Sequence, residues 1–277
     1  MSKNWTELTL ENKKEIAEII ISGKKVHDKT REYLKNHGFI HTGKNKIKDL
    51  IKLIINELNL NKDKCLSRYA NINALNQSEF DVIVGGLLGD TWLGFMKNSA
   101  HASGSFTHKL EHLEYVQYKQ SLLKSRCSEV KIHNKFDSRS NRHYQQAFCK
   151  IAASPILDEI QQKFYQNKIK IVPKDLIDKL SPLGIAIWFM DDGTSTTAGL
   201  SFAVNCFTKE DIEILKDMLY NKFGIESTIQ INQNKTLYIK HSSQQDFIKL
   251  IKPYVCDCMK YKLRTYHMVN GKYIIKE

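Results

Sequence analysis

The stretch Ser181-Pro-Leu-Gly-Ile-Ala-Ile-Trp-Phe-Met-Asp-Asp192 repeats the pattern of an earlier one, Ser78-Glu-Phe-Asp-Val-Ile-Val-Gly-Gly-Leu-Leu-Gly-Asp90. Each begins with a residue that caps helices, continues as an apolar run with small residues, and ends in aspartate. A helix that is apolar on nearly every face must be buried, and glycines allow two such helices to pack backbone to backbone. The pattern therefore predicts two buried helices whose final aspartates lie side by side.

Aspartates at two adjacent helix ends indicate a metal site. A helix C-terminus carries about half a negative charge, so a carboxylate at each end adds a like charge that a bound cation would neutralise. Asp90 and Asp192, with the carbonyl oxygens of Gly89 and Asp191 at the same helix ends and with phosphate oxygens of a substrate, are the hard ligands that Mg²⁺ prefers. The alternative is a pair of buried helices whose aspartates merely face solvent.

About 100 residues separate the two aspartates, which is the length of a half-domain and not of a short solenoid repeat. Each is followed by alternating strand and helix patterns. Strands are expected at 103–107, 129–136, 144–151, 200–206, 227–232 and 236–240, and helices at 110–126, 155–166, 209–222 and 243–252. Residues 76–180 and 181–277 are therefore expected to form two similar halves.

Residues 1–75 differ in texture from the rest of the chain. Helical periods are found at 10–21, with Gly23 as a stop, at 26–36 and at 45–59, and no stretch is typical of a strand. The segment has 15 Lys and Arg against 9 Asp and Glu, half of the net charge in about a quarter of the chain. It is expected to be a helical extension, either a DNA-contacting accessory of the helix-turn-helix kind or a solvated helical cap.

Composition narrows the function classes. The chain of 277 residues has a formal net charge of +12, which favours polyanionic partners such as nucleic acids or an anionic membrane surface. No apolar run approaches the roughly 18 residues of a membrane span, and the first residues match neither a secretory signal nor a transit peptide. We therefore expect no membrane association and no secretion.

Cysteines and histidines do not indicate a zinc enzyme. The six cysteines are scattered without a C-x-x-C pair and are expected to be reduced thiols. The histidines between the two motifs lack the helical spacing of metal ligands; they are His101, His108, His112, His133 and His143.

With these residues in view, the sequence resembles the LAGLIDADG homing endonucleases in their single-chain, two-motif form. The first motif is Ile83-Val-Gly-Gly-Leu-Leu-Gly-Asp90-Thr91, with Gly89 where the family name has alanine, and the second is Ile185-Ala-Ile-Trp-Phe-Met-Asp-Asp192-Gly193. The resemblance extends over about residues 80–265 and includes Lys170-Ile-Val-Pro173 and Met259-Lys-Tyr-Lys-Leu263. Residues 1–75 have no recognised counterpart.

The resemblance implies a mixed α/β (α+β) fold of two pseudo-symmetric αββαββα halves, with saddle-shaped antiparallel sheets lying on the DNA, plus the helical N-terminal extension. It implies a monomer that cuts double-stranded DNA at a long, asymmetric site and needs Mg²⁺, for which Mn²⁺ is expected to substitute. It also implies that Asp90 and Asp192 bind the metals, and that Lys170 and Lys262 act as basic residues near the activated water.

The chemistry agrees with these roles. Phosphodiester hydrolysis needs a generated nucleophile, charge neutralisation at phosphorus and stabilisation of the leaving alkoxide, which metals held by two carboxylates supply. Lysine adds positive charge at the phosphate. In a chain this basic, Lys170 and Lys262 can alternatively be two of many solvated surface lysines.

Alternate side chains of a strand face the same side of a sheet, and a two-stranded ribbon can enter the major groove of DNA. The candidate DNA-contacting residues on such strands and their hairpins are Ser105, Thr107, Lys131, His133, Arg139, Arg142, Gln145, Ser201, Ala203, Gln230, Asn232, Tyr238 and Lys240.

Two binding functions compete with DNA cleavage. An intron RNA maturase would keep the fold and the basic saddle without needing the metal site, so intron RNA is a possible second partner beside double-stranded DNA. A DNA-binding regulator without catalysis would be expected to lose the carboxylates that are present here. The protein is expected in a mitochondrion or chloroplast if its gene is there, and otherwise inside the cell with access to DNA.

Overall fold

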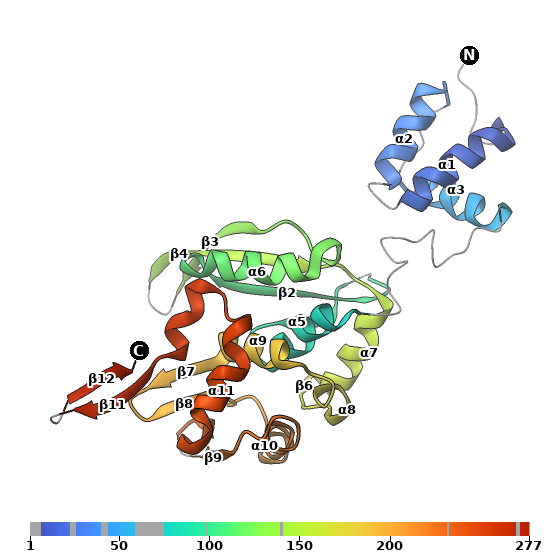
Figure 1. The fold of residues 1–277 in the computed structure, drawn as a ribbon. Helices are drawn as coiled ribbons and strands as arrows, with labels where there is room; N and C mark the ends of the chain where they lie inside the picture. Colours follow the sequence, from blue (N-terminus) through green and yellow to red (C-terminus); the bar gives the residue numbers. More distant parts are fainter. Residues whose placement is uncertain are drawn as a thin grey trace. The chain divides into compact units, whose positions relative to one another are not determined.

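A computed structural model describes residues 7–22, 26–39, 44–58, 75–97, 99–138, 141–231, 233–269 and 272–276. The chain divides into two compact units, residues 1–74 and 75–277 (Figure 1). Each unit has a hydrophobic core of its own. No helix among these residues is long and apolar enough to cross a membrane.

The described residues of the first unit form three helices, α1 (Leu10–Ser22), α2 (Val26–Asn36) and α3 (Lys44–Glu57). Their bounds agree with the helical periods of the sequence. Thr9 precedes α1, and its hydroxyl accepts a hydrogen bond from the Asn12 amide at 3.2 Å, which satisfies one of the free donors of the first turn. Apolar residues from all three helices, among them Ile16, Leu34 and Ile54, are fully buried together.

The larger unit contains the same seven elements twice, which confirms the αββαββα order. The first set is α5 (Gln77–Leu88), β1 (Trp92–Phe95), β2 (Ala102–Lys109), α6 (Leu113–Leu123), β3 (Lys131–Asp137), β4 (Arg142–Ile151) and α7 (Pro155–Phe164). The second set is α9 (Pro182–Asp192), β7 (Gly193–Thr196), β8 (Gly199–Ala203), α10 (Lys209–Phe223), β9 (Ser227–Ile231), β10 (Lys235–Ile239) and α11 (Gln244–Ile251).

Each set of strands forms an antiparallel four-stranded sheet, ordered β1-β2-β4-β3 in the first half and β7-β8-β10-β9 in the second. The elements that link or follow the halves are β5 (Tyr165–Gln166), β6 (Ile169–Lys170), α8 (Lys174–Ile177), the hairpin of β11 (Thr265–Val269) and β12 (Lys272–Lys276), and the 3₁₀ helices η2 (Leu110–His112), η3 (Lys124–Arg126), η4 (His241–Ser243), η5 (Lys252–Tyr254) and η6 (Asp257–Leu263).

The two motif helices, α5 and α9, pack against each other at the centre of this unit (Figure 1). A Cβ placed on Gly85 would lie 2.3 Å from the carbonyl oxygen of Gly184, so only glycine allows the helices to come this close. The carboxylate of Asp81 in α5 accepts hydrogen bonds from the amide and the hydroxyl of Ser181, the N-cap residue of α9. The backbone packing predicted from the glycines is therefore confirmed.

The helix beginnings differ in one respect from the prediction. Ser181 caps α9 as expected, and its hydroxyl accepts from the Leu183 amide at 3.2 Å. The first motif helix, however, begins at Gln77 and is capped by Asn76, not by Ser78. The reason is a capping box: the Asn76 side chain accepts from the Glu79 amide, and the Glu79 carboxylate accepts from the Asn76 amide.

Candidate active site

The ends of the two motif helices touch. α5 ends at Leu88, so Asp90 lies just beyond the cap residue Gly89, whereas Asp192 is the last residue of α9. The amide of Asp90 donates a hydrogen bond to Asp191 Oδ2 at 3.3 Å, and a Cβ on Gly89 would lie 2.4 Å from the Asp191 Cβ. The carboxylate-bearing ends are thus side by side, as the sequence predicts.

Asp90 and Asp192 form a region of concentrated negative charge. The Asp90 side chain is 47% exposed, and Asp192 is half-buried. Burial is the main cause that raises the pKa of Asp192 to about 7, and repulsion from Asp90 and Asp191 adds to it. A divalent cation bound between these carboxylates would relieve this repulsion, and the donor set consists of the hard oxygens that suit Mg²⁺.

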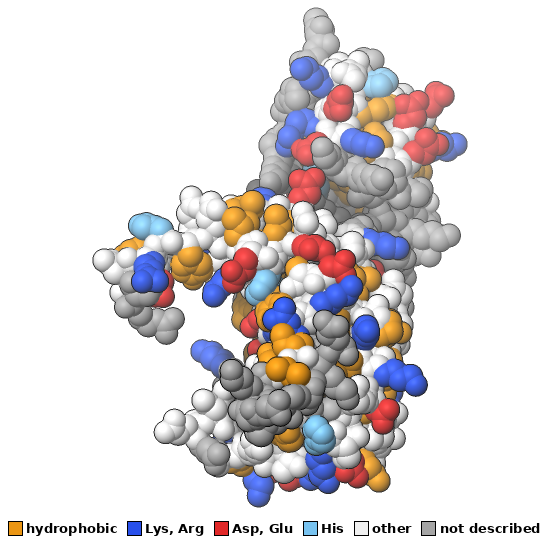
Figure 2. All heavy atoms as spheres, turned by 60° about the vertical axis from the view of Figure 1, so that its left-hand side comes forward, with side chains coloured by type: hydrophobic (Ala, Val, Ile, Leu, Met, Phe, Trp, Pro, Cys, Tyr) orange, Lys and Arg blue, Asp and Glu red, His pale blue; other side chains and the backbone are white. Residues whose placement is uncertain are grey.

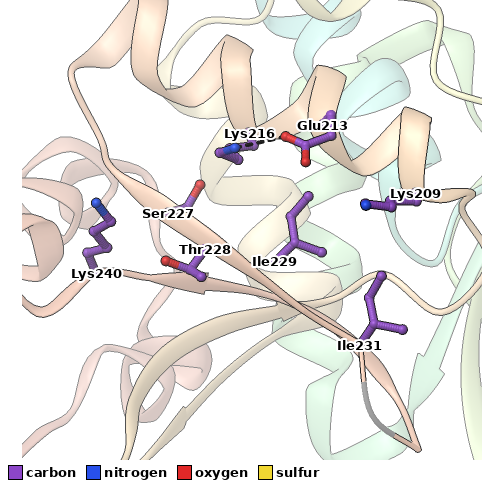
Figure 3. Close-up of a pocket in the computed structure, with 8 residues that line it drawn as sticks. All are labelled: Lys209, Glu213, Lys216, Ser227, Thr228, Ile229, Ile231 and Lys240. Atoms are coloured by element: carbon purple, nitrogen blue, oxygen red, sulfur yellow. Dashed lines mark hydrogen bonds and ion pairs between the residues drawn. The ribbon is translucent and has the colours of Figure 1, made fainter.

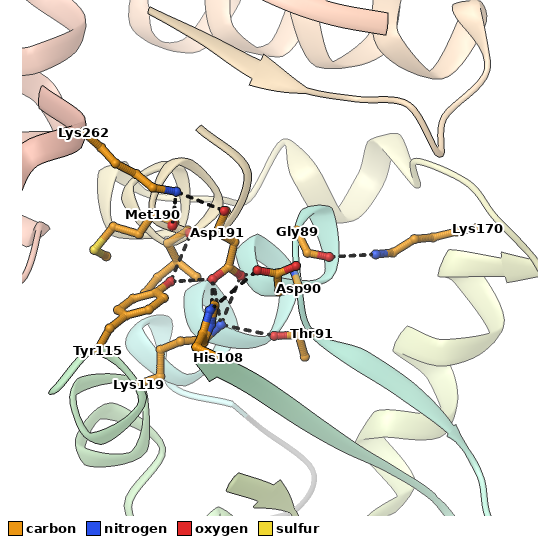
Figure 4. Close-up of polar contacts among 11 residues, drawn as sticks. Gly89, Asp90, Thr91, His108, Tyr115, Lys119, Lys170, Met190, Asp191 and Lys262 are labelled. Atoms are coloured by element: carbon orange, nitrogen blue, oxygen red, sulfur yellow. Dashed lines mark hydrogen bonds and ion pairs between the residues drawn. The ribbon is translucent and has the colours of Figure 1, made fainter. Parts of the chain in front are cut away.

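Lys170 and Lys262 each lie against the end of one motif helix (Figure 4). Lys170 Nζ, from β6, donates to the carbonyl oxygen of Gly89 at 3.2 Å. Lys262 Nζ, from η6, donates to the carbonyl oxygens of Met190 at 2.6 Å and Asp191 at 3.1 Å. These lysines are therefore not solvated surface residues; their ammonium groups compensate the negative ends of the two helices.

The same lysines meet the carbonyls that the sequence assigns to the metal. A carbonyl oxygen has two lone pairs, so the oxygens of Gly89 and Asp191 can accept from lysine and still face a cation. Burial lowers the pKa of both lysines, while the charges of Asp90, Asp191 and Asp192 oppose this shift. The two ammonium groups therefore hold their protons less tightly than surface lysines do.

The side chain of Asp191 is fully buried and is already bound by the protein. Its carboxylate accepts hydrogen bonds from the Tyr115 hydroxyl at 2.7 Å and from Lys119 Nζ at 3.0 and 3.2 Å (Figure 4). Burial alone would raise the pKa of Asp191, but Lys119, His108 and Tyr115 outweigh it and hold the pKa well below its usual range. Asp191 can therefore offer a metal its backbone oxygen, but not a free carboxylate.

His108 lies between the aspartates although the histidine spacing indicates no metal site. Its Nδ1 is 3.7 Å from Asp90 Oδ2, and its Nε2 is 3.4 Å from Asp191 Oδ1. Ligand atoms of Asp90, His108 and Asp191 all lie within 4.8 Å of one another. The rule on helical spacing of metal ligands does not find this histidine, because His108 lies on strand β2 and only the tertiary fold brings it to the helix ends.

Tyr115 and Lys119, in α6, are site residues that sequence reasoning missed. The sequence contained one signal for Lys119: it follows Tyr115 by four residues and Val116 by three, so it occupies a core position of an amphipathic helix. A lysine at such a position needs a buried anionic partner, which here is Asp191.

The register of the first sheet separates the predicted DNA-contacting residues by face. Ser105 and Thr107 of β2 pair with Lys150 and Phe148 of β4, so they share a face that alternates with buried Phe106. The face also includes Lys131, His133 and Arg142. Part of it forms a hollow of about 410 Å³ lined by Thr107, His133, Lys135, Gln146 and Phe148.

Gln145 does not share this face. It pairs with Asn134 and donates a hydrogen bond to its side chain at 3.0 Å. Its alternation along β4 places it with buried Ala147 and Cys149, on the opposite face of the strand. Arg139, another candidate, lies outside the described residues.

In the second sheet, Ser201 pairs with Tyr238, and Ala203 with Thr236, which in turn pairs with Gln230. These residues share a face that alternates with buried Leu200, Phe202 and Leu237. Figure 2 shows a hollow between two projecting parts of the larger unit, with Lys and Arg side chains at its edges. Asn232 lies outside the described residues.

Lys240 lies one residue beyond the end of β10. Its Nζ pairs with Glu226 at 3.1 Å, and it lines a groove between α10 and the edge strand β9 (Figure 3). The groove also contains Lys209 and Lys216, but Lys216 pairs with Glu213 at 2.8 Å. The groove also includes Thr228, which pairs with Tyr238 on the face of Ser201, so it lies along the β9 edge of the sheet.

The profile of the LAGLIDADG DNA endonuclease family matches residues 80–247, which include both motifs. The chain belongs to this family. Among curated relatives, this LAGLIDADG protein is similar to the cytochrome b mRNA maturase bI2 of Saccharomyces cerevisiae, with 30% identity over 261 residues. That match covers 86% of the chain but only 57% of the yeast protein.

Other relatives of this LAGLIDADG protein include a maturase and an endonuclease. The cytochrome b mRNA maturase bI2 of Debaryomyces hansenii is 30% identical over 221 residues, covering 73% of the chain and 80% of that protein. The DNA endonuclease I-ChuI of Chlamydomonas applanata is 27% identical over 212 residues, covering 69% and 96%.

Among solved structures, the homing endonuclease I-WcaI bound to its DNA recognition sequence matches with a TM-score of 0.65 and 23% identity. The match covers 75% of this chain and 96% of that one, and it confirms the LAGLIDADG fold.

Proposed function

We propose that this chain is a metal-dependent homing endonuclease that hydrolyses both strands of DNA at a long, asymmetric site. The observation that carries the proposal is the meeting of Asp90 and Asp192 where the two motif helices end, with one buried lysine at each end. A protein that only bound nucleic acid would have no use for repelling carboxylates at this position.

The residues fit a divalent cation. The carboxylates of Asp90 and Asp192 and the backbone oxygens of Gly89 and Asp191 would hold it. When bound, Mg²⁺ or Mn²⁺ supplies an activated water and neutralises charge on the phosphate. Lys170 and Lys262 place positive charge beside the scissile phosphates, and their lowered pKa helps them exchange protons with the water around the site.

Double-stranded DNA is the proposed partner of a monomeric protein. Each sheet presents polar residues on one face, Ser105, Thr107 and His133 in the first half and Ser201 and Gln230 in the second. Two non-identical halves in one chain suit an asymmetric target. The structural relative I-WcaI, which is bound to its DNA recognition sequence, supports this partner.

RNA splicing is a second candidate function. It is favoured by the two relatives named cytochrome b mRNA maturase. Relatives named as intron-encoded endonucleases support an origin of the gene within an intron. DNA cleavage is the preferred function because the carboxylates of Asp90 and Asp192, one exposed and one half-buried, suit a metal site.

Selection of cleaved sites from a randomised DNA library in Mg²⁺ tests the proposal. We expect one long sequence to be cut, and we expect Asp192→Asn to bind it with unchanged affinity but to cut at least about a thousandfold more slowly. The endonuclease proposal is overturned if the unmodified chain cuts no library member. Tight binding of its intron RNA in the same preparation would then identify a maturase.

A further inference from the structure

The two motifs differ at the residue before the final aspartate. The first motif has Gly89 there and the second has Asp191. The Asp191 side chain crosses into the first half, where its contacts are Tyr115 and Lys119 of α6, His108 of β2 and the Asp90 amide. Glycine at position 89 leaves the space that this carboxylate needs. The pseudo-symmetry of the unit is therefore broken at its centre.

The Lys119–Asp191 ion pair is completely buried. Both side chains are 0% exposed, and Lys119 Nζ lies 4.8 Å from the centre of the Phe106 ring. Desolvation of two charges offsets most of their attraction, so a buried ion pair adds little stability compared with apolar residues of the same size. In some proteins a buried ion pair instead fixes one arrangement of the neighbouring groups. The groups that contact this pair therefore indicate its role.

The pair contacts the Asp90 amide and the side chain of the next residue, Thr91. Asp191 Oδ2 accepts from the Asp90 amide at 3.3 Å, and Lys119 Nζ donates to the hydroxyl of the next residue, Thr91, at 3.4 Å. The Thr91 amide in turn donates to the carbonyl oxygen of Gly86 in α5 at 2.8 Å. Asp90 is thereby tied to α6, α9 and α5 while its own carboxylate stays half exposed.

Asp192 is held differently: it is the last residue of helix α9, and its backbone does not depend on the ion pair. Among the residues that the structure describes, no hydrogen bond to the Asp192 carboxylate is formed. Because Asp90 lies beyond the end of α5 and its backbone is held through Asp191 and Thr91, damage to the ion pair should affect Asp90 first.

We propose that the Lys119–Asp191 ion pair is a positioning device for Asp90: it sets the backbone, and hence the direction of the Asp90 carboxylate toward a divalent cation, without either side chain contacting metal or DNA. This inference rests on the proposed endonuclease function. Lys119 acts as a resident cation that saturates Asp191, so that the cation bound from solution is directed to Asp90 and Asp192. An ion held by a misdirected Asp90 carboxylate would bind more weakly.

The test is the double variant Lys119→Met/Asp191→Asn, which removes both charges while keeping volume and an acceptor for Tyr115. Mn²⁺ occupancy is measured by electron paramagnetic resonance on the protein, free and with its selected DNA. We expect the Mn²⁺ concentration for half occupancy to rise about tenfold, DNA affinity in EDTA to stay unchanged, and the two strands to be cut at unequal rates.

The matched control is Arg126→Met/Glu79→Gln, which removes a largely buried ion pair (2.8 Å) at the opposite end of α5. It should lower the melting temperature while leaving Mn²⁺ occupancy unchanged. Thr91→Val removes only the hydroxyl that Lys119 contacts, and it serves as a second test if the double variant fails to fold. For this variant we expect the Mn²⁺ concentration for half occupancy to rise about two- to threefold.

The positioning role is overturned if Lys119→Met/Asp191→Asn, or Thr91→Val where the double variant does not fold, loses melting temperature but binds Mn²⁺ and cuts both strands as the control does. That outcome leaves the endonuclease proposal intact. Failure of the unmodified chain to cut any DNA overturns the endonuclease proposal, and the Mn²⁺ occupancy of the variants still decides whether the pair positions Asp90.

Discussion

Consecutive aspartates at the end of α9 have opposite electrostatic environments. Asp191 is buried next to a lysine, a tyrosine hydroxyl and a histidine, and it stays ionised. Asp192 is half-buried without such partners and faces two other carboxylates, so its pKa is raised to about 7. One peptide bond thus separates a carboxylate that holds the structure from one that is suited to bind a cation.

The raised pKa of Asp192 predicts a pH dependence of stability in the metal-free protein. Its pKa is about 7 in the folded chain against a normal value of 3.8, so the folded state binds more protons between pH 4 and 7. Asp192 therefore makes the free energy of unfolding fall as pH rises through that window, and contributes no further slope above it.

We expect Asp192→Asn to remove this part of the slope. The measurement is urea unfolding of both proteins in EDTA from pH 4.5 to pH 8. The difference between the two curves isolates Asp192 from other titrating groups. Parallel curves would mean that Asp192 titrates normally and that the carboxylates do not repel each other as the structure indicates.

Sequence reasoning at this scale worked where the signal was local. The motif aspartates and the glycines between the helices could be predicted, because each motif carries its own pattern of apolar, small and acidic residues. Tyr115, Lys119 and His108 could not be assigned in that way. Lys119 and Tyr115 are 72 and 76 residues away from Asp191 in the chain, and His108 is farther still. Their contacts with Asp191 depend on how the whole fold places α6 and β2.

At the scale of elements, period-two alternation sorts the strand residues. Thr107, Lys131 and His133 share the exposed face because the strands pair in register. Arg142 and Gln145 are three residues apart on β4 and so cannot share a face, a conflict that the alternation rule itself contains. Strands β1 and β7 were not predicted because four-residue strands directly after the aspartates give too short a pattern.

Lys131 offers a test of the exposed face of the first sheet. It is exposed on β3, so Lys131→Ala should weaken DNA binding about three- to tenfold and lower the salt dependence by about one counterion. Lys249→Ala is the charge-matched control, since Lys249 is exposed on α11, which covers the core side of the second sheet. Affinities are measured by fluorescence anisotropy over a salt series. Equal losses for both variants would show a non-specific charge effect.

Lysines from β6 and η6 occupy equivalent places at the two helix ends, so each should serve one strand of the DNA. Lys170→Met and Lys262→Met are each expected to slow cutting of a different strand by about a hundredfold, because each removes one positive charge beside one phosphate. Strand-specific end labels report the two rates separately. Lys174→Met, which removes an exposed lysine of α8, should leave both rates unchanged.

If both variants slow the same strand, the two lysines do not act as a symmetric pair. The assignment of one lysine to each half would then be incorrect even though both lie at the helix ends.

At the scale of the whole molecule, two motifs that recur at half-domain spacing predict two similar halves, and the family resemblance implies their αββαββα order. The hairpin of β11 and β12 was not predicted, since it has no counterpart in the repeat. The helices of residues 1–74 were predicted from their periods, but their role was not, because mixed charge on short helices suits both a nucleic-acid contact and a solvated cap.

Deletion of residues 1–74 distinguishes these two roles. The segment has a separate core, so residues 75–277 should keep their fold and melting temperature after its removal. If the segment contacts DNA, the loss of half the net positive charge weakens binding at low salt and reduces the slope of log affinity against log salt by several units, roughly one for each lost phosphate contact. An affinity and a slope equal to those of the full chain would make the segment a solvated cap, and DNA recognition would then rest on the two sheets alone.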